Sequence, residues 1–135
     1  MLLGLLADVR PGLPTIYNDY PERYIRQADD FLRASYPDVV KDKVPTIFGA
    51  EGLTADLLLL GGDGISVKYF DIIGVRKFPD STSYYQRGLA VDAVAHEYLH
   101  LTSSLTHEQI YSRAREITAD FLSRISPDAA FSRAR

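Results

Sequence analysis

The pentapeptide His96-Glu97-Tyr98-Leu99-His100 constrains this chain more than any other stretch, because it forms a coherent group only on a helix. Helical residues i and i+4 project in nearly the same direction, so the two imidazoles lie one turn apart with the Glu97 carboxylate beside them. The chain has only 3 histidines, and two of them rarely fall at this spacing around a glutamate by chance. We therefore expect a helix that presents His96 and His100 to one ligand.

The ligand that best suits this H-E-x-x-H pattern is Zn²⁺. Zinc takes imidazole nitrogens at about 2.0–2.1 Å, and catalytic zinc sites typically use three protein donors and leave a fourth position for water. Glu97 lies next to the metal without ligating it, where a carboxylate can take a proton from the bound water and pass it to a leaving amine. The pattern predicts metal-assisted hydrolysis with His96 and His100 as ligands and Glu97 as the general base.

The pentapeptide does not contain the third ligand. A metzincin continues as H-E-x-x-H-x-x-G-x-x-H, but Ser103 and Thr106 stand here at the glycine and third-histidine positions. His107 is one residue out of register and follows Thr106, which is typical of a helix cap, so we interpret His107 as a surface residue. Further on, Glu116 and Asp120 lie one turn apart on one face of a second predicted helix. Glu116 is therefore the better candidate.

The segment from Glu116 to Asp120 reads E-x-x-A-D, and its position after H-E-x-x-H resembles the gluzincin metallopeptidases, particularly compact members in which a short connection separates the two motifs. The resemblance implies that His96, His100 and Glu116 are the zinc ligands and that Glu97 is the catalytic base. It also implies that Asp120 accepts a hydrogen bond from a ligand histidine and orients its ring, as carboxylates behind zinc-bound imidazoles usually do.

Glu116 and Asp120 also have an ordinary interpretation. On an exposed helix face, Glu116 pairs with Arg113 or Arg115 and Asp120 pairs with Arg124, each for a few tenths of a kcal/mol. The metal interpretation is favoured because Glu116 borders an apolar stripe, where a carboxylate pointing at a neighbouring helix needs a partner. The stripe consists of Ile110, Ala114, Ile117, Phe121 and Ile125.

Composition narrows the class of protein. With 135 residues, 46% of them hydrophobic, the chain suits one domain with a real core. It has no cysteine, so a metal would be held by nitrogen and oxygen, and a cytoplasmic setting fits.

The net charge is −3 and no basic stripe is present, so we expect no nucleic-acid partner. The apolar run at residues 1–7 is too short for a bilayer and lacks a basic flank, so we expect neither a membrane span nor secretion.

Helical periodicity marks three segments. The first begins near Pro21, which suits the first helical turn, and runs to about Ser35. The second begins near Arg87, carries H-E-x-x-H and is apolar nearly all round, which is typical of a buried central helix. Thr106 and Gln109 form a capping-box pattern at the start of the third. The turn before Thr106 is short, so the last two helices should be neighbours.

Short β-like runs lie between these helices, at residues 45–48, 55–60 and 65–70, and residues 72–78 form either a fourth run or a continuation of the third. The glycine-rich tetrad at residues 61–64 has neither a Walker lysine nor a following helix, so we interpret it as a hairpin turn that uses positive φ. The gluzincin resemblance implies that an edge strand binds an extended peptide above the zinc through main-chain hydrogen bonds, and residues 65–78 are the candidate.

We predict an α+β fold in which one layer of helices covers one small sheet, mostly antiparallel or mixed. The order is N-terminal helix, sheet, active-site helix and C-terminal ligand-bearing helix, which by resemblance is zincin-like. Residues 1–135 are expected to form a single metallopeptidase domain. Residues 127–135 lack periodicity, and we expect them either to be a mobile tail or to fold back across the site.

The leading functional hypothesis is a zinc-dependent peptidase that hydrolyses bonds of a peptide or protein substrate through a zinc-bound water, with Glu97 as general base. The phenols that could stabilise an oxyanion are Tyr69, Tyr84, Tyr85 and Tyr111, and the sequence does not choose among them. One alternative is a latent or non-catalytic zinc-binding domain that binds a protein partner, since so short a chain leaves little for the far wall of a cleft. Another is a metal-free helical module in which the histidines are structural.

Overall fold

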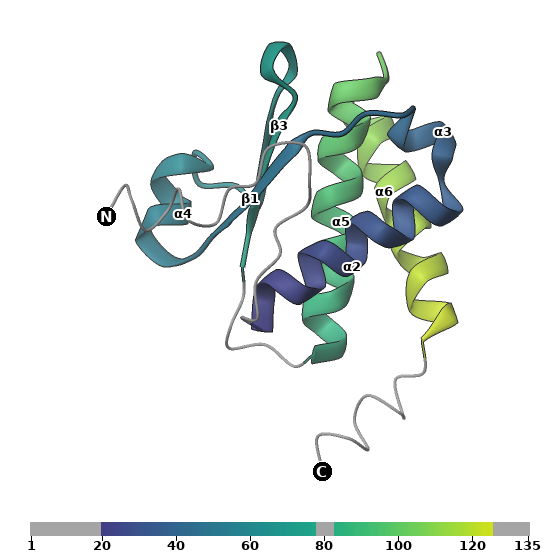
Figure 1. Ribbon diagram of the computed structural model, residues 1–135, viewed down its shortest axis with the longest axis horizontal. Helices are drawn as coiled ribbons and strands as arrows, with labels where there is room; N and C mark the ends of the chain where they lie inside the picture. Colours follow the sequence, from purple (N-terminus) through teal and green to yellow (C-terminus); the bar gives the residue numbers. More distant parts are fainter. Residues whose placement is uncertain (1–19, 78–82, 126–135) are drawn as a thin grey trace.

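The computed structural model describes residues 20–77 and 83–125 (Figure 1). The apolar run at residues 1–7 and the predicted tail at residues 127–135 lie outside the described residues. Within these residues, five α-helices and three strands follow one another in the order α2 (Tyr20–Ser35), α3 (Pro37–Val40), β1 (Thr46–Ala50), α4 (Gly52–Leu58), β2 (Gly64–Val67), β3 (Ile72–Arg76), α5 (Ser83–Thr102) and α6 (His107–Arg124). The predicted α+β class is confirmed.

The three strands form a small mixed sheet in the order β1-β3-β2. β1 pairs with β3 in parallel, with Ile47 opposite Ile73, and β2 pairs with β3 in antiparallel register, with Gly64 opposite Val75. Within the described residues β2 is therefore an edge strand. Residues 65–67 of β2 fall within residues 65–78, the candidate for the edge strand, but that segment also contains β3, which is the central strand.

The main hydrophobic core lies between the sheet and four helices. Alternation along β1 and β3 turns Ile47, Ile73 and Val75 toward this side, where they share one buried cluster with residues of α2, α3, α5 and α6. Figure 1 shows these helices together beside the sheet, with α5 in the middle. The expected burial of the H-E-x-x-H helix is confirmed, because Val94 and Tyr98 of α5 have no exposed surface. None of the described helices is both long and apolar enough to cross a bilayer.

The prediction of a strand at residues 55–60 is wrong, because the segment belongs largely to helix α4. Leucine and alanine are strong helix formers, and Ala55 and Leu59 lie one turn apart on the helix face that is buried. They pack with Phe48 and Ile65 against the sheet face opposite the main core. Helices thus cover both faces of the sheet (Figure 1) rather than one.

The glycine-rich tetrad consequently does not close a hairpin. It connects α4 to β2, and Gly61 uses the expected positive φ of 81°. The hairpin of this sheet lies further on, between β2 and β3, where a 3₁₀ turn at Lys68–Phe70 is followed by Asp71 in the left-handed region.

A buried polar cluster joins α2 to α5. Tyr98 donates a hydrogen bond to the carboxylate of Asp29, which has no exposed surface. Arg33 donates to Asp29 through Nε at 2.8 Å and to the Tyr98 hydroxyl through Nη2 at 2.8 Å. Burial and the negative charge of Asp29 raise the pKa of Tyr98, so the phenol stays protonated and remains a donor. Because Tyr98 lies inside the H-E-x-x-H pentapeptide, this cluster fixes the helix that carries the histidines.

Candidate metal centre

A helical hairpin brings the three histidines of the chain together. Thr106 caps α6 through a complete capping box, accepting a hydrogen bond from the Gln109 amide while the Gln109 side chain accepts one from the Thr106 amide. This cap places His107 at the first position of α6, directly after the short turn that follows α5. His96 and His100 lie one turn apart near the end of α5. The hairpin therefore brings the first turn of α6 against the last turns of α5.

The ligand atoms of His96, His100 and His107 all lie within 4.8 Å of one another. Nε2 of His96 and Nε2 of His100 are 3.1 Å apart, and the nitrogen atoms of a tetrahedral zinc site are about 3.3 Å apart. The pair on α5 already has this spacing. His107 is exposed and stands at a helix end, so its ring can close the remaining distance by a rotamer change. The donor set fits a three-histidine centre with an open fourth position.

The surroundings keep the two imidazoles of α5 neutral. Burial lowers the pKa of His96 to about 4, and the proximity of His100 and His107 adds to this effect. Burial likewise lowers the pKa of His100, and His107 contributes. A metal ligand must present a deprotonated ring nitrogen. At neutral pH the two histidines of α5 are in the form that binds a metal.

Glu97 points away from solvent, toward the edge strand β2. It is only 6% exposed, and it lines a cavity of about 100 Å³ together with His96 and Tyr111. Burial raises the pKa of Glu97 to about 7, and a hydrogen bond with the Ser66 side chain opposes the rise. A carboxylate with a pKa near neutrality, next to two imidazoles, is suited to take up and release a proton.

The approach of Glu97 to β2 depends on a glycine. A Cβ atom added at Gly64 would lie 2.7 Å from Oε2 and 3.0 Å from Cγ of Glu97. No side chain fits there unless the Glu97 side chain moves. Gly64 is therefore required by close packing against the carboxylate and not by an unusual φ.

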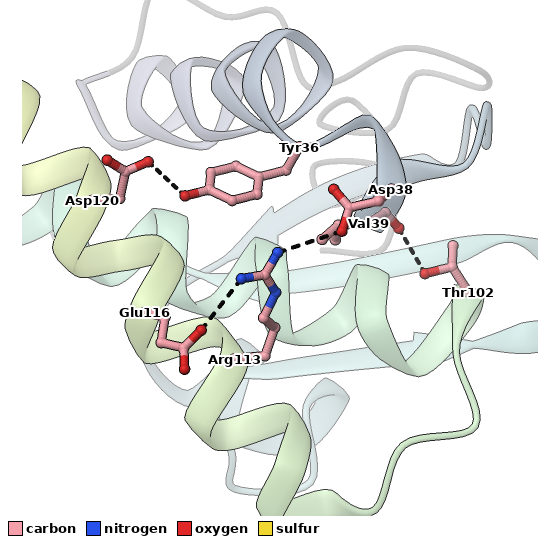
Figure 2. Close-up of polar contacts among 7 residues, drawn as sticks. All are labelled: Tyr36, Asp38, Val39, Thr102, Arg113, Glu116 and Asp120. Carbon is pink, nitrogen blue, oxygen red and sulfur yellow. Dashed lines mark hydrogen bonds and ion pairs between the residues drawn. The ribbon is translucent and has the colours of Figure 1, made fainter.

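The structure does not bring Glu116 and Asp120 to the histidine pair. Figure 2 shows Glu116 turned toward Arg113, whose Nη1 is 3.3 Å from Oε2 of Glu116. Asp120 forms a two-atom ion pair with Arg124, at 2.8 and 3.1 Å, and accepts a hydrogen bond from Tyr36. The side chain of Glu116 is 68% exposed. These contacts are the surface ion pairs of the ordinary interpretation, and the predicted set of His96, His100 and Glu116 is not the set that the structure assembles.

Helix geometry explains this difference. Each residue advances an α-helix by about 100°, so nine residues place Glu116 roughly half a turn around α6 from His107. The two side chains flank opposite sides of the buried stripe that contains Ile110 and Ala114. A single orientation of α6 can present only one of them to α5, and the observed orientation presents His107.

Sequence reasoning assigned His107 to the surface and missed its proximity to the other two histidines. The residue is indeed exposed, but its ring centroid lies 5.2 Å from that of His96 and 5.5 Å from that of His100. Two features of the sequence were sufficient to place His107 near the other two histidines. The capping box fixed His107 at the start of α6, and a short turn fixed that start beside the end of α5.

Of the four tyrosines considered as donors to an oxyanion, Tyr111 lies next to the histidines. The Tyr111 ring meets those of His96 and His107 edge to face, at centroid distances of 4.9 and 4.8 Å. Tyr69 is 96% exposed at the β2–β3 hairpin, and Tyr84 and Tyr85 line a different cavity between α5 and α6.

We found no match to a protein-family model, to a curated protein or to a solved structure. The gluzincin resemblance therefore stays a prediction from the two motifs. The fold and the site define an α+β protein with a three-histidine candidate metal centre on a helical hairpin.

Proposed function

We propose that this chain is a zinc-dependent peptidase with a zincin-like arrangement, in which His96, His100 and His107 hold the metal and Glu97 is the general base. The observation that carries the proposal is the convergence of three imidazole nitrogens within 4.8 Å beside a cavity lined by both His96 and Glu97. Three nitrogen ligands with an open position are typical of catalytic zinc. A Zn²⁺ ion bound there supplies a Lewis acid that polarises a carbonyl and makes water more acidic.

The chain's own residues account for the proton movement of hydrolysis. Water adds its oxygen to the carbonyl carbon of the peptide bond, the C–N bond breaks, and the amine leaves with a proton. Glu97 accepts a proton from the water and passes it to the leaving nitrogen. In the metal-free protein, burial raises the pKa of Glu97 to about 7, and a carboxyl group that resists ionisation in this way is suited both to accept a proton and to release it.

An extended peptide is the substrate that best suits the surface beside this cavity. β2 is an edge strand among the described residues, and its first residue, Gly64, lines the cavity that contains Glu97. The free main-chain groups of an edge strand can pair with a substrate backbone. Pairing along β2 would bring a peptide bond toward Glu97 and the histidines.

Measurement of bound zinc distinguishes His107 from Glu116 as the third metal ligand. Purified protein should contain near-equimolar zinc by mass spectrometry, and His107→Ala should lower zinc affinity by a factor of at least about 10² through the loss of one of three ligands. Glu116→Ala is the matched control, because it removes a side chain from the same helix without touching the histidines. We expect it to leave zinc affinity unchanged.

Two results would contradict this assignment. Loss of zinc in Glu116→Ala with retention in His107→Ala would restore the ligand set implied by the gluzincin resemblance. Absence of zinc from the natural protein, even after incubation with the metal, would leave a metal-free helical module with structural histidines.

Gly64→Ala should lower the rate of peptide hydrolysis without removing zinc. The added methyl group would push the Glu97 carboxylate from its position, since the built Cβ lies 2.7 Å from Oε2. A misplacement of about 1 Å can lower a catalytic rate by about 10²-fold. Gly62→Ala is the matched control, because a Cβ there comes no closer than 3.5 Å to any neighbour. Equal kcat/KM values in the two variants would show that the position of Glu97 is not critical.

A further inference from the structure

A second cavity opens beside the candidate metal centre, between α5 and α6. Its volume is about 340 Å³, which accommodates an aliphatic or aromatic side chain. The wall is mainly apolar, and polar groups enter it from Asp92, Arg115 and Thr118. The apolar part of the wall includes Tyr84, Tyr85, Leu89, Ala119 and Leu122.

Asp92 and Leu89 line both this apolar cavity and the smaller one that contains His96 and Glu97. Asp92 is one helical turn from His96, so the two residues are about 6 Å apart along α5. A ligand that reaches from the histidines into the apolar cavity would pass Asp92 and Leu89, the residues that the two cavities share.

The Asp92 carboxyl group lacks a full set of partners. Its Oδ1 atom is buried and has no hydrogen-bond partner among the described residues. Thr118 interacts with the carboxyl group, but its hydroxyl donates its proton to the carbonyl oxygen of Ala114 at 2.8 Å. A buried acceptor without a donor is unfavourable and calls for an explanation. A donor on a bound ligand would provide one.

The charge around the smaller cavity indicates which donor fits. Its described lining contains three carboxyl side chains, from Asp63, Asp92 and Glu97, and no lysine or arginine. Asp63 is paired with Arg76, whose Nε lies 3.4 Å from Asp63 Oδ1, and Arg115, which lines the apolar cavity, offsets part of the negative charge of Asp92. The site therefore favours a cationic group at Asp92, directly beside the histidines.

A free peptide amino terminus meets these requirements. A single Cα atom separates its ammonium group from the first peptide carbonyl. A carbonyl held at the histidines therefore brings the ammonium group close to Asp92. The side chain on the same Cα can then enter the apolar cavity. An internal residue offers only a neutral amide N–H at this point, which adds no positive charge to the partial compensation that Arg115 gives Asp92.

We propose that Asp92 binds the free α-amino group of the substrate and that the apolar cavity takes the side chain of its first residue, so that the chain is an aminopeptidase for apolar N-terminal residues. This inference rests on the proposed peptidase function. It specifies the substrate class and assigns to Asp92 a binding role that is separate from metal binding and proton transfer.

Binding of small ligands tests the amine site without any need for turnover. L-Phenylalaninamide and N-acetyl-L-phenylalaninamide differ only in the charge and substitution of the amine. Titration of each into the zinc-loaded protein, followed by NMR chemical shifts, should show at least about tenfold tighter binding of the free amine. Asp92→Asn should abolish this difference, whereas Asp30→Asn, an exposed change on α2, should leave it unchanged. Equal affinities in the natural protein, or no binding of either ligand, would overturn the proposal.

Peptide hydrolysis tests the substrate class. A peptide that begins with phenylalanine should be cleaved at its first bond at least about tenfold faster than the same peptide after N-acetylation, and Asp92→Asn should remove the preference chiefly through KM. Faster cleavage of the acetylated peptide would overturn the proposal and leave an endopeptidase. Selective amine binding through Asp92 without cleavage of any peptide would contradict the proposed function and leave the amine site in place.

Discussion

Glu97→Gln should lower the rate of peptide hydrolysis by about 10²- to 10⁴-fold, the usual contribution of a positioned general base. Glutamine keeps the size of the side chain and its approach to β2, but its amide cannot accept and return a proton near neutrality. Glu97 is 6% exposed and is not one of the converging metal ligands, so the variant should keep its zinc. The loss should therefore appear in kcat with unchanged metal content.

The measurement pairs single-turnover hydrolysis with zinc analysis on the same samples, and Glu116→Gln is the control. Both changes neutralise one glutamate, but Glu116 is 68% exposed and paired with Arg113, so its replacement should leave kcat within a factor of about two. A Glu97→Gln protein that turns over as fast as the natural one would contradict the general-base role. No turnover in zinc-loaded natural protein would favour the latent zinc-binding alternative.

Sequence patterns were sufficient to predict those features of the structure that depend only on local geometry. The spacing of His96 and His100 requires only one helical turn, and the box formed by Thr106 and Gln109 is closed within four residues. Both expectations hold in the structure. The stripe from Ile110 to Ile125 likewise faces the core. Apolar residues that recur at the helical period lie on one face of the helix, and that face is buried wherever the helix packs.

The sequence was insufficient to predict which side chain of α6 faces the histidines of α5, because that choice depends on tertiary packing. His107 and Glu116 border opposite sides of the stripe on α6, and nothing local decides which border faces the histidines of α5. In the structure the second border is occupied by contacts with Tyr36, which follows α2, and with α3. Tyr36 donates to Asp120, and Arg113 lies 3.4 Å from Asp38 (Figure 2). These pairings join residues more than seventy positions apart, beyond the reach of periodicity.

The helix at residues 52–58 illustrates a different limit. A short leucine-rich run between turn signals is compatible with a buried strand or a short helix, and its period does not distinguish them. The deciding contacts are those of Ala55 and Leu59 with Phe48 and Ile65 on the far face of the sheet. That face is available only after β1, β2 and β3 have paired, so the sequence offered no local reason to choose the helix.

Asp29→Ala should lower the free energy of unfolding of the zinc-free protein by about 3–5 kcal/mol, the range for breaking a buried charged pair. Asp29 has no exposed surface, and it accepts hydrogen bonds from Tyr98 and from Arg33. Its removal leaves the phenol of a fully buried tyrosine without its acceptor and a partly buried guanidinium without its counter-charge. The loss is a large fraction of the roughly 5–15 kcal/mol that stabilises a typical domain.

Urea unfolding followed by circular dichroism measures this change, and Asp30→Ala is the matched control on the next residue of α2. Asp30 is exposed and lies 4.0 Å from Arg26, so its removal should cost less than about 0.5 kcal/mol. Asp29→Asn keeps an oxygen acceptor for Tyr98 but loses the charge that pairs with Arg33, and should fall between the two.

Similar stabilities for Asp29→Ala and Asp30→Ala would show that the buried cluster does not hold α2 against α5. A large loss in Asp29→Ala that bound zinc largely restores would have a further meaning. Tyr98 lies between His96 and His100 on α5, so a metal that binds only the folded hairpin adds its binding free energy to that of folding. The cluster and the metal would then stabilise the same helix from opposite sides, one through α2 and the other through α6.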